Sequence, residues 1–443
     1  MGIWWITEAI PIPVTALLPV VLFPVLGITS SGEAASAYAN HLIFLFMGGF
    51  IIALAMQKWN LHKRIALHII ALVGTGTRRI ILGFMIATAF LSMWVSNTAT
   101  TIMMVPIGMA VIDYFREEDS EQNDSNFALS LMLGIAYSAS VGGIGTLIGT
   151  PPNLVLANTL EKMYGKTIGF AEWFAIGFPL VIIMIPIIWL WLTRVIYPPR
   201  KLERETSVIG DEIRGLGPAG RGEKITLAVF VLTALCWIFR QTKVIGGIVI
   251  PGLDRLMPGI SDSAIAIFFA SVMFLIPVRR DRPEFLMDWE HASRLPWGIL
   301  LLFGGGLSLA AGFRISGLAR WIGTRVRIFS DTPEIILIGA VILIIIFLTE
   351  MTSNTATTAM VLPILGSVAV GLGKAPLVLM APAAIAASCA YMLPVATPPN
   401  AIIFASGCVK IPQMSRAGFF LNLISIVIIV LLTYFYIIPV MIR

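Results

Sequence analysis

The sequence predicts an all-α, polytopic membrane protein that contains two inverted repeats, and three observations support this prediction. Of the 443 residues, 58% are apolar and 12% are charged, and the mean hydropathy is +0.91. Apolar runs separated by polar clusters follow one another along the whole chain. Two short polar elements occur twice, in the same order, inside these runs. Because a soluble domain carries about 25% charged residues, the composition argues against a soluble enzyme, a disordered protein and a nucleic-acid-binding protein.

The net charge and the cysteines fit the same class. A net charge of +6 is typical of membrane proteins, because Lys and Arg accumulate in their cytoplasmic loops. The three cysteines, Cys236, Cys389 and Cys408, lie in separate apolar stretches without a CxxC pair or a Cys/His cluster. They are therefore expected to be packing residues rather than disulfide partners or metal ligands.

The length leaves room for about ten membrane crossings, since one helical crossing takes about 20 apolar residues. Several apolar runs are shorter than this, and the short runs occur in pairs separated by polar or proline-rich breaks. The expected helical segments are 13–28, 41–57, 80–95, 99–112, 127–148, 154–160, 172–196, 225–240, 263–278, 297–312, 334–351, 356–372, 376–395, 401–407 and 417–440.

An internal repeat is the most informative feature of the chain. The twelve residues that begin Ser-Asn-Thr-Ala-Thr-Thr at Ser96 recur at Ser353 with nine identities. Each copy is followed by a Thr-Pro-Pro-Asn element, at Thr150 and at Thr397, and is preceded by a glycine-rich span. Three matched landmarks in one order indicate a true repeat rather than a chance resemblance.

The segments 80–112 and 334–372 are each predicted to be a re-entrant hairpin, which enters and leaves the membrane on one side. With 58–79 placed in the cytoplasm, the predicted cytoplasmic segments contain 19 of the 30 Lys and Arg residues, which agrees with the positive-inside rule. The first hairpin then opens from the cytoplasm and the second from outside. The repeats are therefore inverted, which is the architecture of many secondary transporters.

Small polar residues in the middle of an apolar run indicate a broken helix. At a break, the carbonyl end of one half-helix suits a cation and the N–H end of the next suits an anion. Two consecutive prolines also interrupt a helix, which predicts discontinuous helices at 127–148/154–160 and at 376–395/401–407. The two hairpin tips and the two interruptions are expected to meet near the middle of the membrane. The alternatives are hydroxyls that only bond to neighbouring helices and prolines that only kink them.

The distribution of charge points to a co-bound cation. Beyond Arg79, no Lys, Arg or His lies near the repeated elements. A bound anion would therefore lack a protein cation, and burial of an unpaired charge is costly. Na⁺ held by Asn97, Asn354, hydroxyls and backbone carbonyls is the expected counter-charge.

Glu350 is the exception to the neutral character of these segments. It lies three residues before Ser353, and its counterpart in the first repeat is Met93. A carboxylate at membrane depth is by default a functional candidate, so a proton or cation role is one interpretation. Hydrogen bonding to a neighbouring helix, or snorkelling, is the alternative.

At these residues the chain resembles the divalent anion:sodium symporter family, the INDY-like di- and tricarboxylate carriers. The resemblance rests on the segment Trp5-Ile-Thr-Glu-Ala-Ile-Pro11, both Ser-Asn-Thr elements and both Thr-Pro-Pro-Asn elements, and it covers nearly the whole chain. Family members have helices before the segment that begins at Trp5, whereas this chain starts almost at it. The first two membrane helices are therefore expected to be missing or shortened.

The resemblance implies a homodimer whose transport domain moves against a scaffold domain, as in an elevator. The expected division is 1–79 scaffold, 80–197 first transport repeat, 198–329 scaffold with an interfacial arm, and 330–443 second transport repeat. The substrate-binding residues that it implies are Ser96, Asn97, Thr98, Thr150, Ser353, Asn354, Thr355, Thr397 and Pro398. The implied Na⁺ ligands are Ser92, Ser96, Asn97 and Gly149 in one site, and Thr349, Thr352, Asn354 and Ala396 in the other.

The expected function is import of C4-dicarboxylates such as succinate, malate and fumarate, coupled to Na⁺, by a multi-pass protein of the cell membrane. The alternatives are a Na⁺-independent dicarboxylate exchanger and a carrier for citrate or sulfate. An intramembrane enzyme is disfavoured because no paired catalytic residues occur at membrane depth. A passive channel is disfavoured because broken helices in inverted repeats suit alternating access. The expected partners are the anion, Na⁺, the lipid bilayer and a second copy of the chain, with no nucleic acid.

Overall fold

A computed structural model describes residues 1–74, 76–118, 125–200, 208–245, 248–279 and 284–441, and these are mostly helical. The described residues also contain one two-stranded antiparallel sheet, in which β1 (Lys243–Ile245) pairs with β2 (Ile248–Ile250). The first helices are α1 (Gly2–Thr7), α2 (Ile12–Thr15), α3 (Leu18–Val25), α4 (Ser31–Ser36), α5 (His41–Lys58), α6 (Leu61–Val73), α7 (Thr77–Ser92), α8 (Asn97–Glu118), α9 (Ser125–Ile144), α10 (Pro151–Tyr164) and α11 (Phe170–Leu190). The remaining helices are α12 (Val208–Gly215), α13 (Arg221–Ile238), α14 (Asp262–Met273), α15 (Trp289–Ala292), α16 (Trp297–Ile315), α17 (Leu318–Arg325), α18 (Glu334–Thr349), α19 (Asn354–Gly371), α20 (Leu377–Ala387), α21 (Pro398–Ala405), α22 (Ile411–Leu432) and α23 (Ile438–Met441).

Seven of the described helical segments are long and apolar enough to cross a membrane, fewer than the ten crossings expected from length. Four shorter apolar segments accompany them: Ile12–Val25, Asp262–Met273, Glu334–Thr349 and Leu377–Ala387. Large apolar side chains on the outside of the bundle are exposed, among them Phe435 at 68% and Ile182 at 55%. Such a surface is stable in contact with lipid rather than water.

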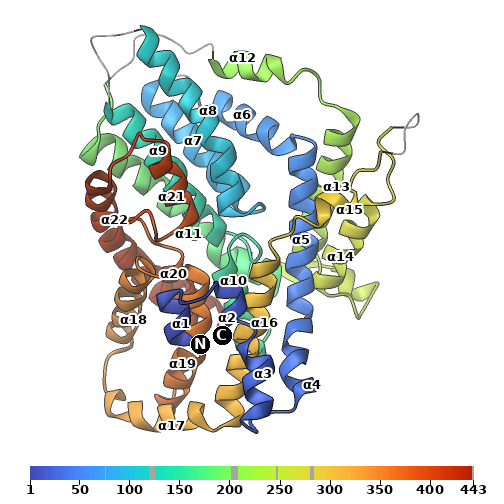
Figure 1. Ribbon diagram of the computed structural model, residues 1–443, viewed down its shortest axis with the longest axis vertical. Coiled ribbons are helices and arrows are strands. Elements are labelled where there is room, and N and C mark those ends of the chain that lie inside the picture. The colour runs from blue at the N-terminus through green and yellow to red at the C-terminus, as the bar shows by residue number, and fades with distance from the viewer. Residues whose placement is uncertain (75, 119–124, 201–207, 246–247, 280–283, 442–443) are drawn as a thin grey trace.

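The two segments that were predicted to be re-entrant hairpins each form a pair of consecutive helices. The first pair is α7 and α8, which are separated by residues 93–96, and the second is α18 and α19, separated by 350–353. Both second helices begin at the Asn of the Ser-Asn-Thr element, so each helix break falls where the polar residues predicted it. In Figure 1 the first pair lies in the upper part of the molecule and the second in the lower part.

The two discontinuous helices are also present, but both were predicted to run too far before their interruptions. The first interruption covers 145–150, between α9 and α10, so α9 ends four residues before the predicted 148. The run 376–395 was expected to be helical, whereas α20 ends at Ala387 and 388–397 contain no α-helix. In both cases the first proline occupies the first position of the following helix, where the missing N–H costs nothing and the fixed φ favours a helical start.

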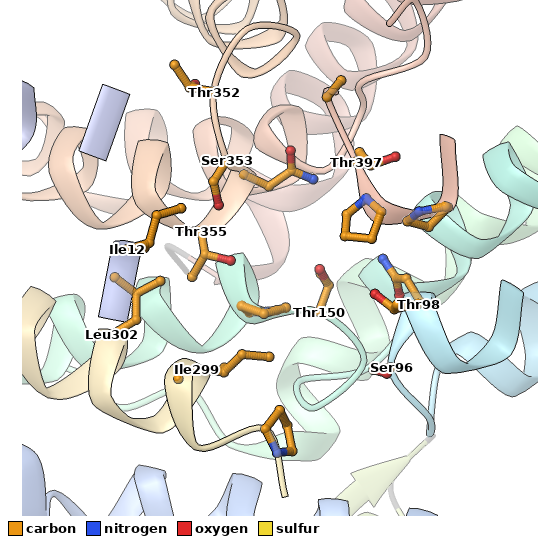
Figure 2. A pocket seen from close by; sticks show the side chains of 18 of the residues that line it. Ile12, Ser96, Thr98, Thr150, Ile299, Leu302, Thr352, Ser353, Thr355 and Thr397 are labelled. Carbon is orange, nitrogen blue, oxygen red and sulfur yellow. The ribbon is translucent and has the colours of Figure 1, made fainter. Parts of the chain in front are cut away.

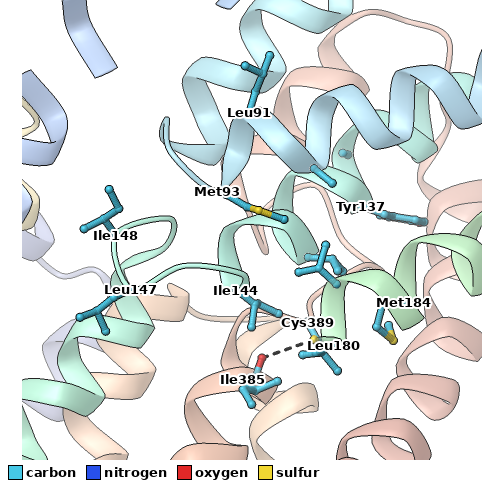
Figure 3. Packing of buried hydrophobic residues seen from close by; sticks show 14 of the residues in the cluster. Leu91, Met93, Tyr137, Ile144, Leu147, Ile148, Leu180, Met184, Ile385 and Cys389 are labelled. Carbon is cyan, nitrogen blue, oxygen red and sulfur yellow. Dashed lines mark hydrogen bonds between the residues drawn. The ribbon is translucent and has the colours of Figure 1, made fainter. Parts of the chain in front are cut away.

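The core between the two repeats is formed by α9, α11 and α20, and it is closely packed. Every residue from Phe127 to Ile144 is buried. A Cβ on Gly142 would lie 2.6 Å from Cα of Ala89, so the backbones of α9 and α7 are in contact and only glycine fits there. Figure 3 shows Cys389 among these apolar side chains, where its Sγ donates to the carbonyl of Ile385. This cysteine is a packing residue, as predicted.

The N-terminal helices pack against helices from the second half of the chain. Helix α1 contacts α19, and α2 contacts α16. Figure 1 shows α1 and α2 near the middle of the molecule, next to α10 and α16. The chain from Trp5 to Pro11, which the sequence singled out, therefore lies near the four helix breaks.

Candidate functional site

The helix breaks surround one cavity of about 880 Å³. Figure 2 shows Ser353 and Thr355 on one side of it, Ser96 and Thr98 on the other, and Thr150 between them. Helices α2, α5 and α16 close the remaining side with apolar residues. All nine predicted substrate-binding residues line the cavity: Ser96, Asn97, Thr98, Thr150, Ser353, Asn354, Thr355, Thr397 and Pro398.

The residues predicted as Na⁺ ligands fall into two groups. Gly149, Thr352 and Ala396 line the cavity together with Ser96, Asn97 and Asn354. Ser92 and Thr349 do not line it; both are fully buried at the ends of α7 and α18. Their hydroxyls contact the side chains of Asn97 and Asn354, respectively, at the tips of the same helix pairs.

The first tip contains a cluster of three oxygens. Ser92 Oγ lies 2.6 Å from Asn97 Oδ1 and also 2.6 Å from the carbonyl oxygen of Ala139. A serine hydroxyl has one hydrogen and can donate to only one of these acceptors at a time. A Cβ on Gly143 would lie 2.5 Å from Asn97 Oδ1, so glycine is required at that position of α9.

The second tip repeats this arrangement at matched positions. Thr349 Oγ1 lies 2.7 Å from Asn354 Oδ1 and 3.0 Å from the carbonyl oxygen of Ala387. Nearby, the hydroxyls of Thr352 and Thr357 are 2.6 Å apart. Neutral oxygens in such numbers are the ligands that a hard monovalent cation requires, and no group of three His, Cys, Asp or Glu side chains suited to a metal was found in the described chain.

Each cluster is placed beside a helix N-terminus that faces the cavity. Helices α8 and α19 begin at Asn97 and Asn354, after residues that also line the cavity. At a helix start the first N–H groups lack backbone acceptors and the helix dipole is positive. The same tip can therefore hold an anion on its N–H side and a cation on its oxygen side.

The Asn of each Thr-Pro-Pro-Asn element holds the neighbouring loop in place. Asn153 Nδ2 donates to the carbonyls of Gly143 and Thr146, at 3.1 and 2.7 Å. Asn400 Nδ2 donates to the carbonyls of Ala390 and Leu393, at 3.2 and 3.0 Å. These bonds satisfy carbonyls that the helix interruptions leave free, and they position the Thr that precedes the two prolines.

Glu350 is a buried anchor for the second interruption. It is 3% exposed. Its Oε1 accepts hydrogen bonds from the backbone N–H groups of Tyr391 and Met392, at 2.7 and 3.0 Å. Its Oε2 accepts from Leu393 at 3.2 Å, and Asn422 Nδ2 on α22 donates to Oε1 at 2.8 Å.

The position of Glu350 follows from the early end of α20. Residues 391–393 are not helical, so their N–H groups need another acceptor, and a carboxylate supplies several acceptor sites at once. The hydrogen bond from Asn422 on α22 agrees with the interpretation that Glu350 bonds to a neighbouring helix. In the first repeat, Met93 uses its backbone carbonyl instead, which accepts from Thr146 Oγ1.

The lining of the cavity is almost free of charge. Among the described residues that line it, none is Lys, Arg or His, and Glu8 is the single carboxylate. Sequence reasoning did not assign Glu8, Phe46, Phe50 or Leu302 to the site, although all four line it. Phe46, Phe50 and Leu302 lie in apolar runs, where an apolar side chain gives no signal of which side it faces; Glu8 lies in the segment from Trp5 to Pro11, and its charge could have marked it.

Replacement of Gly143 by alanine is expected to lower the affinity for Na⁺ by about tenfold. The added Cβ would lie 2.5 Å from Asn97 Oδ1 and 3.1 Å from Asn97 Nδ2, and overpacking of this kind costs about 1–3 kcal/mol. The measurement is the Na⁺ concentration that gives half-maximal thermal stabilisation. Gly339→Ala is the matched control, because its Cβ would meet only Val430, at 3.8 Å; an unchanged Na⁺ response in Gly143→Ala would contradict the assignment.

The fold and the site together define a multi-pass membrane transporter: seven candidate spans surround a polar cavity formed by helix breaks from two halves of the chain. The chain belongs to the family described as the sodium:sulfate symporter transmembrane region, whose model matches residues 1–443.

Curated relatives are named for a narrower activity. The chain is 44% identical to a sodium-dependent dicarboxylate transporter, SdcS, of Staphylococcus saprophyticus, over 99% of this chain and 84% of the relative. It is 46% identical to the protein of the same name in Staphylococcus aureus strain MRSA252, with the same coverage. The family and these names identify a transporter rather than an enzyme.

Two solved transporters share the fold at low sequence identity. MtrF of Neisseria gonorrhoeae is 16% identical, with a TM-score of 0.62 over 94% of this chain and 85% of that protein. YdaH of Alcanivorax borkumensis is 14% identical, with a TM-score of 0.59 over 91% of this chain and 87% of that one.

Proposed function

We propose that the protein imports C4-dicarboxylates such as succinate, malate and fumarate, and that Na⁺ drives this import. The observation that carries the proposal is the pair of matched oxygen clusters beside a cavity whose described lining contains no cationic side chain. A dianion in this cavity needs positive charge from solution. The names of the staphylococcal relatives support both the ion and the class of substrate.

Each hairpin tip holds one carboxylate of the substrate and one Na⁺ in this proposal. Ser96, Asn97 and Thr98 at one tip, with the corresponding residues at the other, offer N–H and hydroxyl donors to the carboxylates. The cluster around Ser92 binds one Na⁺ and the cluster around Thr349 the other. Thr150 and Thr397, which begin the second halves of the interrupted helices, complete the pocket with Pro398.

The cavity is exposed to each side of the membrane in turn by an elevator-type movement of inverted repeats. The appearance of the two hairpins in opposite parts of Figure 1 supports the inversion. Contacts of α10 with α19 and α20, and of α21 with α8 and α9, support movement of the segments 80–197 and 330–443 as one transport domain. The segments 1–79 and 198–329 form the scaffold, and two copies of the chain form a homodimer.

The test is uptake of labelled succinate into proteoliposomes that contain the purified protein. An inward Na⁺ gradient is expected to drive uptake, K⁺ in its place is not, and excess malate or fumarate is expected to compete. Equal uptake without Na⁺, seen only when the vesicles contain a dicarboxylate, would instead show an exchanger. Because the family description names sulfate, sulfate and citrate are tested as competitors; stronger competition by either would contradict the C4 preference.

A further inference from the structure

Helices α6 and α17 occupy matched places in the two halves of the chain. When the two Ser-Asn-Thr elements are aligned, Leu318 at the start of α17 takes the position of Leu61 at the start of α6. Each helix follows a residue in the left-handed conformation, Asn60 with φ 54° and Gly317 with φ 76°. We call these two helices the first arm and the second arm. Figure 1 shows the second arm running across the lower end of the molecule, and it contacts α19.

The cations of the first arm are bound by acidic residues of the same chain. Lys63 Nζ lies 2.8 Å from a carboxylate oxygen of Glu212 on α12. Arg64 lies 3.1 Å from Glu223 on α13 and also donates to the carbonyl oxygen of Gly217, at 3.0 Å. This end of the bundle therefore supplies its own negative charge through α12 and α13.

The cations of the second arm have no such partner among the described residues. Arg320, at the position of Lys63, and Arg325 are exposed, and neither forms an ion pair with a carboxylate in the described part of the chain. Of the acidic residues that follow the arm, Glu334 is bound by Lys374 at 2.7 Å, and within the same described ranges Asp331 forms no ion pair with an arm arginine. The guanidinium of Arg325 instead lies 5.6 Å from the ring centre of Trp321.

The same arm exposes apolar and aromatic side chains beside these arginines. Trp321 is 58% exposed, and in the turn that follows Ile328 is 81% and Phe329 55% exposed. The opposite face is packed, since Gly323 lies against Gly371 of α19. Exposed arginines next to exposed Trp and Ile are typical of a helix that lies in the membrane interface, with its apolar residues among acyl chains and its charges at the headgroups.

We propose that the second arm is a binding site for the headgroups of anionic phospholipids. Arg320 and Arg325 contact the lipid phosphates, and Trp321 and Ile328 lie at the boundary of the acyl chains. The lipid supplies on this side the negative charge that Glu212 and Glu223 supply to the first arm. Anionic headgroups attract Lys and Arg side chains that lie close to the membrane surface.

The test is a lipid titration of the purified full-length protein in a nonionic detergent, followed by native mass spectrometry. Phosphatidylglycerol is expected to remain bound in preference to phosphatidylcholine. In the double variant Arg320→Gln/Arg325→Gln the affinity for phosphatidylglycerol is expected to fall by about 30-fold, which corresponds to about 1 kcal/mol for each arginine. This measurement requires no transport, so its outcome is independent of the proposed substrate and ion.

The matched control is the double variant Arg279→Gln/Arg294→Gln. It removes the same charge from two arginines that are each 61% exposed but have carboxylate partners, Glu284 at 3.4 Å and Glu290 at 3.1 Å. This control is expected to keep the preference for phosphatidylglycerol. An equal loss in the control, or no preference in the unmodified protein, would overturn the proposal. The proposal would also be overturned if Arg320→Gln/Arg325→Gln kept its bound lipids but changed its oligomeric state. That result would show that the second arm mediates contacts between copies of the chain.

Discussion

Asn97→Ala is expected to abolish Na⁺-dependent uptake while leaving the protein inserted and folded. The substitution removes Oδ1, which lies 2.6 Å from Ser92 Oγ in the first oxygen cluster, and it also removes a polar side chain from the cavity lining. Loss of one interaction with a charged group costs about 3 kcal/mol, which lowers the binding constant by about 100-fold. Asn354→Ala is expected to have the same effect through the second cluster.

Thermal unfolding with and without Na⁺ distinguishes a lost ligand from a damaged fold. A ligand that binds only the folded state at about 100 times its dissociation constant stabilises it by about 2.7 kcal/mol, and this increment is expected to disappear in Asn97→Ala. Asn40→Ala is the matched control, because Asn40 caps the start of α5 by accepting from Leu42 N–H at 2.9 Å and does not line the cavity. The control should lose about 1 kcal/mol of stability and keep the full Na⁺ increment. Normal transport in both Asn97→Ala and Asn354→Ala would refute the assignment of the clusters.

Glu350→Ala is expected to give the largest loss of stability, about 3–5 kcal/mol. It removes the acceptor of three backbone N–H groups and of Asn422 Nδ2, and removal of one member of a buried interaction that involves a charge costs about 3–5 kcal/mol. Because the loop 388–397 contains Ala396 and Thr397, which line the cavity, Na⁺-dependent uptake should fall with the melting temperature. The stability of Glu350→Gln should lie between that of the unmodified protein and that of Glu350→Ala, since the glutamine amide keeps one acceptor oxygen.

Two measurements separate this anchoring role from proton transport by Glu350. If Glu350 is an anchor, the double variant Glu350→Gln/Asn422→Ala should be less destabilised than the sum of the single variants, because the two residues share a hydrogen bond. The pH dependence of the remaining uptake should also be unchanged. A Glu350→Gln protein with native stability but altered pH dependence would instead establish the proton role.

The sequence was sufficient to predict the elements that form the site, because those elements interrupt apolar runs. Polar residues and paired prolines inside a membrane segment have few purely structural explanations, such as a hydroxyl bonded to a neighbouring helix or a proline kink. The second copy of both elements in the same order favoured a shared site over these explanations. The breaks before Asn97 and Asn354, and the helix starts at Pro151 and Pro398, lie within a few residues of the predicted positions. For the same reason all nine predicted substrate residues line one cavity.

The sequence was insufficient where the deciding partner is distant in the chain. Residues 388–395 are apolar apart from Ser388, and the one local helix breaker, Pro394, comes seven residues after Ala387, so the early end of α20 was not indicated locally. The end of that helix depends on Glu350, about forty residues earlier, whose carboxylate accepts the freed N–H groups. Likewise, the hydroxyls of Ser92 and Thr349 bond to the backbone carbonyls of Ala139 and Ala387. A backbone carbonyl occurs at every residue, so no pattern of side chains indicates which carbonyl takes part.

The absence of Lys, Arg and His from the described cavity lining has an electrical consequence. With no cationic side chain at the site, the substrate charge can be balanced only by the ions that are bound with it. A dianion with one Na⁺ at each hairpin tip carries no net charge, so a complete transport cycle would move no net charge across the membrane, because any fixed charge on the transport domain, such as the Glu350 carboxylate, moves out and back. Any inward current during succinate uptake would then count Na⁺ ions beyond these two, and a current close to zero would fix the stoichiometry at two.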